Sequence, residues 1–149
     1  MITLKKATKK ELPIFDGFDK QVHAKNFVFR TGLSKHEAYF ADSDITYLSI
    51  VDAAEKTIGY FILAQDPESD SIEFRRIVVD KDKLGIGQQA IQLMENYCCQ
   101  NFNAKRIWLD AFEDNGRGIH IYKKLGYRFF KQKPYENRRL LFFEKELSK

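Results

Sequence analysis

Two glycines, Gly85 and Gly87, stand between a run of β-branched and aromatic residues at 72–79 and the start of a helical pattern. A strand that feeds such a turn binds phosphate groups well, because the first N–H groups of a helix have no internal partner and carry partial positive charge. Glycine also lets the backbone approach a bulky anion without a Cβ atom in the way. The segment 84–88 therefore predicts an anion-binding turn, with a plain turn as the alternative.

The composition is that of an ordinary folded protein, and it bounds the possible ligands. Of the 149 residues, 44% are hydrophobic and 31% are charged, which suffices for one domain with a core of its own. The net charge of +4 is compatible with a polyanionic ligand. The basic residues alternate with acidic ones and form no dense stripe, which argues against a nucleic-acid-binding domain.

Cysteines and histidines give no sign of a disulfide framework or a metal site. Cys98 and Cys99 are adjacent within one helical pattern, and His23, His36 and His120 are scattered without ligand spacing. We expect reduced thiols and no metal. Neither a signal peptide nor a membrane-spanning run is visible, so we expect a cytoplasmic protein.

Hydrophobic patterning predicts the elements that must position these residues. Apolar residues at helical spacing, Leu12, Phe15, Phe18 and Val22, predict a helix that ends near Ala24. Two capping boxes, at 8–11 and 34–37, predict two helix starts. Further helices are expected at 87–98 and 115–126, and strands at 2–7, 44–52, 57–64, 72–79, 106–112, 127–131 and 139–143. This order of elements, without a linker or repeat, predicts a single α/β domain with a mixed sheet over residues 1–149.

A second motif accompanies the glycine turn. Residues 82–87 read DKLGIG, and residues 115–127 read NGRGIHIYKKLGY, with an Asn, a Tyr and a Gly-aromatic pair at fixed spacing. Together they resemble the signatures of the GNAT superfamily of N-acetyltransferases, Q/R-x-x-G-x-G/A and N-x-x-A-x-x-x-Y-x-x-x-G-F. Asp82 departs from the usual Gln or Arg, and Gly118 from the usual Ala. The resemblance implies a mostly antiparallel central sheet of about six to seven strands flanked by helices.

The resemblance also implies an activity: direct transfer of an acetyl group from acetyl-CoA to a primary amine, on a small molecule or a protein, through a ternary complex. Tyr122 matches the family tyrosine that protonates the departing thiolate, and a phenol suits that role. Glu73 is the carboxylate that we expect to act as base. Strand alternation puts it on one face with Arg75, Ile77 and Val79, unless a bulge intervenes. The cofactor-binding residues that we expect are Ile77, Val78, Val79, Leu84, Gly85, Ile86, Gly87, Gln88, Asn115 and Tyr122.

Other interpretations stay open. Glu73 could be a strand carboxylate paired with an arginine, and Tyr122 could be a core residue. We interpret Asp110 and Glu113 as loop charges, with an acceptor pocket as the alternative. The protein could also be a catalytically inactive sensor or partner-binding module that binds an acyl-CoA, and a homodimer is possible. Aromatic residues are expected to wall the acceptor site, namely Phe15, Phe18, Phe27, Phe29, Tyr39, Phe40, Tyr135, Phe142 and Phe143.

Overall fold

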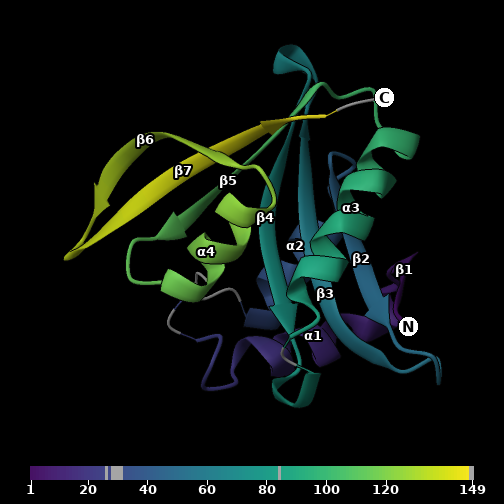
Figure 1. Ribbon diagram of the computed structural model, residues 1–149. Helices are drawn as coiled ribbons and strands as arrows, with labels where there is room; N and C mark the ends of the chain where they lie inside the picture. The colour runs from purple at the N-terminus through teal and green to yellow at the C-terminus, as the bar shows by residue number, and fades with distance from the viewer. Residues whose placement is uncertain (26, 28–31, 84, 148–149) are drawn as a thin grey trace.

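The computed structural model describes all residues except 26, 28–31, 84 and 148–149. Seven strands form one mixed sheet in the order β1-β2-β3-β4-β5-β7-β6 (Figure 1). The strands are β1 (Thr3–Lys6), β2 (Ile45–Val51), β3 (Thr57–Asp66), β4 (Ser71–Val79), β5 (Arg106–Phe112), β6 (Arg128–Tyr135) and β7 (Arg138–Glu146). The described helices are α1 (Leu12–Asp19), α2 (Gly32–Ala41), α3 (Gly87–Asn101) and α4 (Gly116–Lys124). The α/β class and the strand number agree with the expectation.

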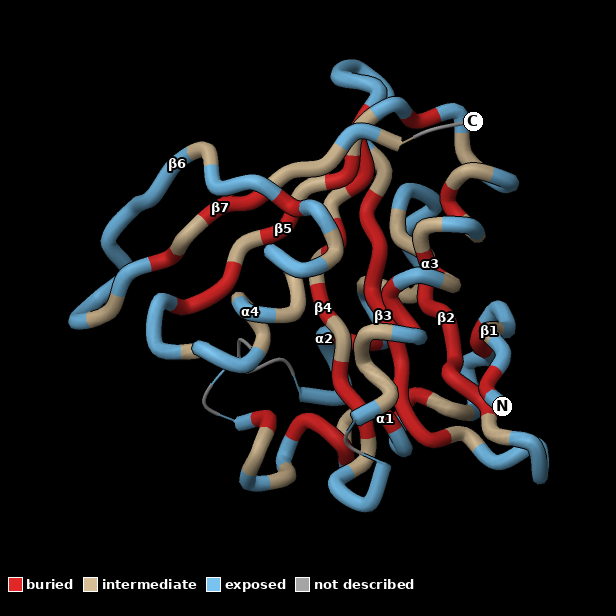
Figure 2. Tube along the Cα trace, in the orientation of Figure 1, coloured by how far each residue is buried: buried red, intermediate tan, exposed pale blue. Residues whose placement is uncertain are grey.

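Helices cover both faces of the sheet and bury a core on each side. On one face, α3 and α4 pack against a cluster that includes Phe61, Ile72 and Met94. On the other face, α1 and α2 pack against a cluster that includes Phe15 and Tyr60. Figure 2 shows that the buried segments run along the central strands, whereas β6 at the edge is mostly exposed. The central strands are therefore held from both sides.

The parallel pair of strands in this sheet separates early. β4 and β5 pair over only three residues each, from Ser71 with Arg106 to Glu73 with Trp108. Beyond these residues the two strands diverge, β4 toward α1 and β5 toward the β6–β7 hairpin (Figure 1). Within the part of the chain that the structure describes, the rest of β4 pairs with β3 alone, and its other edge has no strand partner.

A β-bulge in β4 contradicts the expected strand face of Glu73. Ile62 pairs with Arg76 and Leu63 with Phe74, so Arg75 is an extra residue with no partner on β3. An extra residue reverses the alternation of side chains beyond it. Glu73 therefore shares its face with Arg76 and Val78 on the α1–α2 side. Ile77 and Val79 face α3, together with Phe74.

The first two helices differ from the prediction at their ends. The capping box at Thr8 is confirmed, since its N–H donates to Glu11 Oε1 at 3.1 Å. Helix α1 ends at Asp19 rather than near Ala24, and Val22 is 79% exposed. The second capping box is wrong, because α2 already begins at Gly32, two residues before Ser34. The pattern of short polar residues resembles a cap, but here these residues lie within the helix.

Candidate active site

A cavity of about 1020 Å³ opens where β4 and β5 diverge. Its walls come from β4 and β5, the turn before α3 and the start of that helix, α4, α2, the segment that follows α1, and the β6–β7 hairpin. Residues far apart in the sequence meet on this one surface, among them Glu73, Gly87, Asp110 and Tyr122. The divergence of the strands thus creates the space in which the sequence motifs come together.

One end of the cavity is the glycine turn. Gly85 has φ +109°, a conformation that favours glycine, and a Cβ atom at Gly85 or Gly87 would meet no atom within 4 Å. Ile86 is the N-cap residue of α3 and makes no side-chain cap, and the Ala90 N–H donates to its carbonyl at 2.9 Å. The N–H groups of Gly87 and Gln88 precede that first helical bond and can meet an anion. Leu84 lies outside the described residues.

The open edge of β4 forms one long wall. Asp80 N–H donates to Ile58 C=O of β3 at 2.7 Å. In an antiparallel ladder every second residue directs its N–H and C=O to the same neighbour. Val78 therefore directs its backbone groups to β3, whereas Ile77 and Val79 direct theirs to the cavity. Of the Val78 and Val79 amides, only that of Val79 faces the open side.

Residues of the segment after α1 form hydrogen bonds with the end of β4 and the residues that follow it. His23 Nε2 lies 2.7 Å from the Val79 carbonyl oxygen. Gln21 donates to Asp80 Oδ1 at 3.0 Å and accepts from the Lys81 N–H at 2.9 Å. These contacts occupy the Val79 C=O and leave its N–H toward the cavity. Sequence patterns gave no sign of them, because Gln21 and Asp80 are separated by 59 residues.

Tyr122 projects from α4 into the cavity. Its ring contacts Phe74 edge-on, with centroids 5.9 Å apart, and Tyr127 at 6.2 Å. Burial, with a smaller effect of the Asp110 charge, raises the pKa of Tyr122 to about 12. The phenol therefore keeps its proton at neutral pH and can donate it. This residue is both a packing residue of the core and a hydroxyl group on the cavity wall.

Glu73 and Asp110 are two carboxylates on one side of the cavity. Glu73 Oε1 accepts from Arg75 Nη2 at 2.8 Å and from Arg75 Nε at 3.2 Å, which is the arginine pair that we considered as an alternative role. Asp110 lies within β5 rather than in a loop, which corrects our interpretation. Burial and the negative charge of Glu73 raise the pKa of Asp110 to about 6, against the opposing effects of Lys133 and Arg75.

Asn115 is the N-cap of α4, as expected. Its Oδ1 accepts from the Gly118 N–H at 3.1 Å. A Cβ atom on Gly118 would lie 2.7 Å from Asn115 Nδ2, so the glycine accommodates the folded-back amide. Both residues line the cavity. The cap therefore holds the start of α4 at the wall of the cavity.

The aromatic residues divide between the cavity and the core. Phe27, Tyr39 and Tyr135 line the cavity. Phe15, Phe18, Phe142 and Phe143 are buried core residues instead, and Phe40 is a partly buried residue that packs against the core. Phe29 lies outside the described residues. Three of the expected aromatic residues are thus available to an acceptor, and Arg75 already lies 5.3 Å from the centre of the Tyr39 ring.

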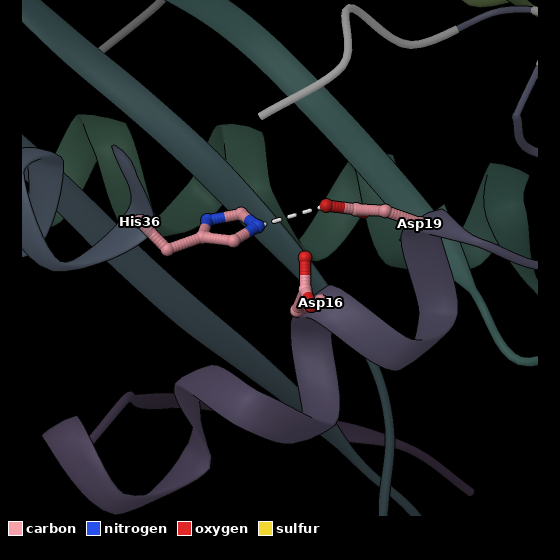
Figure 3. A group of neighbouring side chains, drawn as sticks. All are labelled: Asp16, Asp19 and His36. Carbon is pink, nitrogen blue, oxygen red and sulfur yellow. Dashed lines mark hydrogen bonds and ion pairs between the residues drawn. The ribbon is translucent and has the colours of Figure 1, made fainter. Parts of the chain in front are cut away.

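A buried polar cluster behind β4 had no signal in the sequence. Asp19 accepts from Tyr60 Oη at 2.5 Å, from Arg76 Nη1 at 3.2 Å and pairs with His36 Nε2 at 2.8 Å. Figure 3 shows His36 pointing to Asp19, with Asp16 beside them. The three side chains lie close enough to hold a metal ion. However, both ring nitrogens of His36 already have partners, the second being Tyr47 Oη at 2.6 Å, and Arg76 supplies a positive charge. We interpret the cluster as structural.

Comparison with known proteins identifies the family. Residues 17–127, most of the chain, match the acetyltransferase (GNAT) family. The chain therefore belongs to this family of N-acetyltransferase enzymes, which confirms the resemblance. No curated protein sequence matches it. None of the helices in the described part of the chain combines the length and the apolar character that crossing a membrane requires.

Solved structures of N-acetyltransferases share the fold. Spermidine N-acetyltransferase from Vibrio cholerae, in complex with CoA and spermine, has a TM-score of 0.85 at 15% identity, covering 98% of this chain and 95% of that chain. A dodecameric structure of spermidine N-acetyltransferase from Vibrio cholerae has a TM-score of 0.79 at 14% identity, covering 98% and 94%. A protein assigned as a phosphinothricin N-acetyltransferase has a TM-score of 0.83 at 14% identity, with full coverage of both chains. At these identities the likeness concerns the fold.

Proposed function

We propose that residues 1–149 form one acetyltransferase domain that transfers an acetyl group from acetyl-CoA directly to a primary amine. The observation that carries this proposal is the cavity between the diverging β4 and β5. The glycine turn at the start of α3 lies at one end of it, and Tyr122 and two carboxylates lie on its walls. An anion site and proton-transfer groups within one cavity are what acyl transfer from a nucleotide thioester requires.

The donor would bind along the turn and the open edge of β4. The N–H groups of Gly87 and Gln88 suit its pyrophosphate, because a Cβ atom at Gly85 or Gly87 would meet no atom of the described residues within 4 Å. The backbone groups of Ile77 suit the amides of its pantetheine arm, as an added strand would pair with a sheet edge. CoA bound to the Vibrio cholerae spermidine enzyme supports this donor.

The reaction then needs three groups near the thioester. A carboxylate takes a proton from the ammonium form of the acceptor, so that the amine can attack. The Val79 N–H is directed toward the developing oxyanion. Tyr122 gives its hydroxyl proton to the departing thiolate, and its raised pKa keeps that proton available at neutral pH. The acceptor is a primary amine of a small molecule or a protein.

The test is thiol release from acetyl-CoA with a panel of amines: polyamines, amino acids, aminoglycosides and peptides. We expect release with at least one amine, and a loss of about 100-fold in kcat in Tyr122→Phe with CoA affinity kept. Tyr97→Phe is the matched control, because Tyr97 lies on α3 against Phe102 and does not line the cavity. CoA binding without thiol release for any amine would instead support an inactive acyl-CoA-binding module.

A further inference from the structure

The two carboxylates on the cavity wall are not equivalent. Trp108 pairs with Glu73 across β4 and β5, and the alternation along β5 puts Asp110 on the same face as Glu73, two residues farther into the divergence. Glu73 is engaged by the Arg75 guanidinium through two donors. To accept a proton from a substrate, Glu73 would have to give up part of this charge-assisted pair.

Asp110 has no such engagement. Among the described residues, no hydrogen bond or ion pair involves the Asp110 carboxylate. Every fully buried side-chain oxygen of these residues has a hydrogen-bond partner, so the oxygens of Asp110 are not fully buried. The oxygens of Asp110 are therefore open to the cavity. Around it lie Glu73 and Arg75 on β4, Lys133 on β6 and Tyr122 on α4, the groups whose charges interact with it. Asp110 therefore interacts electrostatically with both the other carboxylate and the phenol on the walls of one cavity.

We propose that Asp110, rather than Glu73, is the general base that takes the proton from the acceptor amine. This inference rests on the proposed function and assigns one of its steps. The ammonium nitrogen gives one proton to Asp110, and the neutral amine attacks the thioester carbonyl carbon. A C–N bond forms and the C–S bond breaks, Tyr122 protonates the thiolate, and the phenolate recovers the second proton of the nitrogen. Asp110 then releases its proton to water.

The electrostatics of the cavity agree with this role. A base that works at neutral pH is most effective when its pKa lies near the operating pH. Burial and the Glu73 charge raise the pKa of Asp110 to about 6, so it is mostly ionised at pH 7 and still more basic than an ordinary aspartate. The Glu73–Arg75 pair also affects the pKa of Asp110: the negative charge of Glu73 raises it, and the positive charge of Arg75 lowers it.

The experiment measures kcat/KM against pH, with the best amine of the panel, for wild type, Asp110→Asn and Glu73→Gln. We expect Asp110→Asn to lose about 100-fold or more and to lose the acid limb of the profile. Glu73→Gln should keep activity within about tenfold and move the acid limb to lower pH, because it removes the charge that raises the Asp110 pKa. Calorimetric titration with CoA checks that both variants bind the donor.

Each outcome decides between the two carboxylates. If Asp110→Asn keeps the acid limb, or if Glu73→Gln abolishes it, the assignment is overturned while the proposed function stands. Should Asp110→Asn fail to fold, the direction of the pH shift in Glu73→Gln decides alone: a shift to lower pH supports Asp110 and an absent limb refutes it. A wild type that releases thiol with no amine overturns the proposed function, and the base assignment with it.

Discussion

Gly59 on β3 lies directly against the backbone of the strand that borders the cavity. A Cβ atom there would come within 2.6 Å of the Val78 carbonyl oxygen and 3.1 Å of Val79 Cα. Both contacts are with backbone atoms, which cannot move aside without shifting β4. We expect Gly59→Ala to lower the free energy of unfolding by about 1 to 3 kcal/mol and to weaken CoA binding, because the edge of β4 moves. Chemical denaturation and calorimetric titration measure the two effects.

The control for this prediction is another glycine with open surroundings. Gly17 lies on the exposed side of α1, and a Cβ atom there meets nothing within 4 Å. Gly17→Ala should raise stability by roughly 0.5 to 1 kcal/mol, since alanine favours helix. Equal effects of the two substitutions on stability would show that Gly59 is not required for the close approach of β3 to β4. A glycine inside a strand pattern could have indicated this contact from the sequence.

Some cavity residues could be predicted from the sequence, and others could not. Tyr122 and Gly87 could be singled out because their motif is local and its spacing is fixed. The roles of Glu73 and Asp110 depend on the bulge at Arg75 and on the register between β4 and β5. A one-residue bulge reverses the strand face, and nothing in the local sequence distinguishes it from a regular strand.

At the scale of elements, the Asp19 cluster joins helices α1 and α2 to β2, β3 and β4. The cluster contains Asp19 of α1, His36 of α2, Tyr60 of β3 and Arg76 of β4. All four side chains are buried. Asp19→Asn removes the negative charge that faces the Arg76 guanidinium in this interior. Removing one partner of a buried pair costs about 3 to 5 kcal/mol. We expect a loss of that size in the free energy of unfolding, measured by urea denaturation.

Asp16 provides the matched control for Asp19, because it belongs to the same helix and the same cluster. Its ion pair is with Lys20, whose side chain is 75% exposed. Such a pair is worth less than about 1 kcal/mol, so Asp16→Asn should change stability little. Similar losses in both variants would contradict a structural role centred on Asp19. Long-range clusters of this kind escape sequence patterns, because no periodicity links residues 19, 36, 60 and 76.

For the whole molecule, the order of elements could be predicted because each strand and helix carries its own hydrophobic period. The prediction covered every strand and every described α-helix, but several ends differ, most at α1, α2 and β6, and the bulge in β4 was not predicted. What could not be predicted is the early separation of β4 and β5. Beyond Glu73 and Trp108 the two strands no longer pair, and the gap between them is what opens the cavity.

Donor binding should therefore stabilise the whole molecule, and Gly87 offers a selective test. A ligand at 100 times its Kd adds about 2.7 kcal/mol, which raises Tm by roughly 5 to 10 °C for a chain of this size. Gly87→Glu should keep the unliganded Tm, because the position is open and an acid suits the first turn of a helix. It should abolish the shift with CoA, since it places negative charge and bulk where the pyrophosphate would lie. Gly17→Glu adds the same charge on α1 and should keep the shift; a full shift in Gly87→Glu would mean that CoA binds elsewhere.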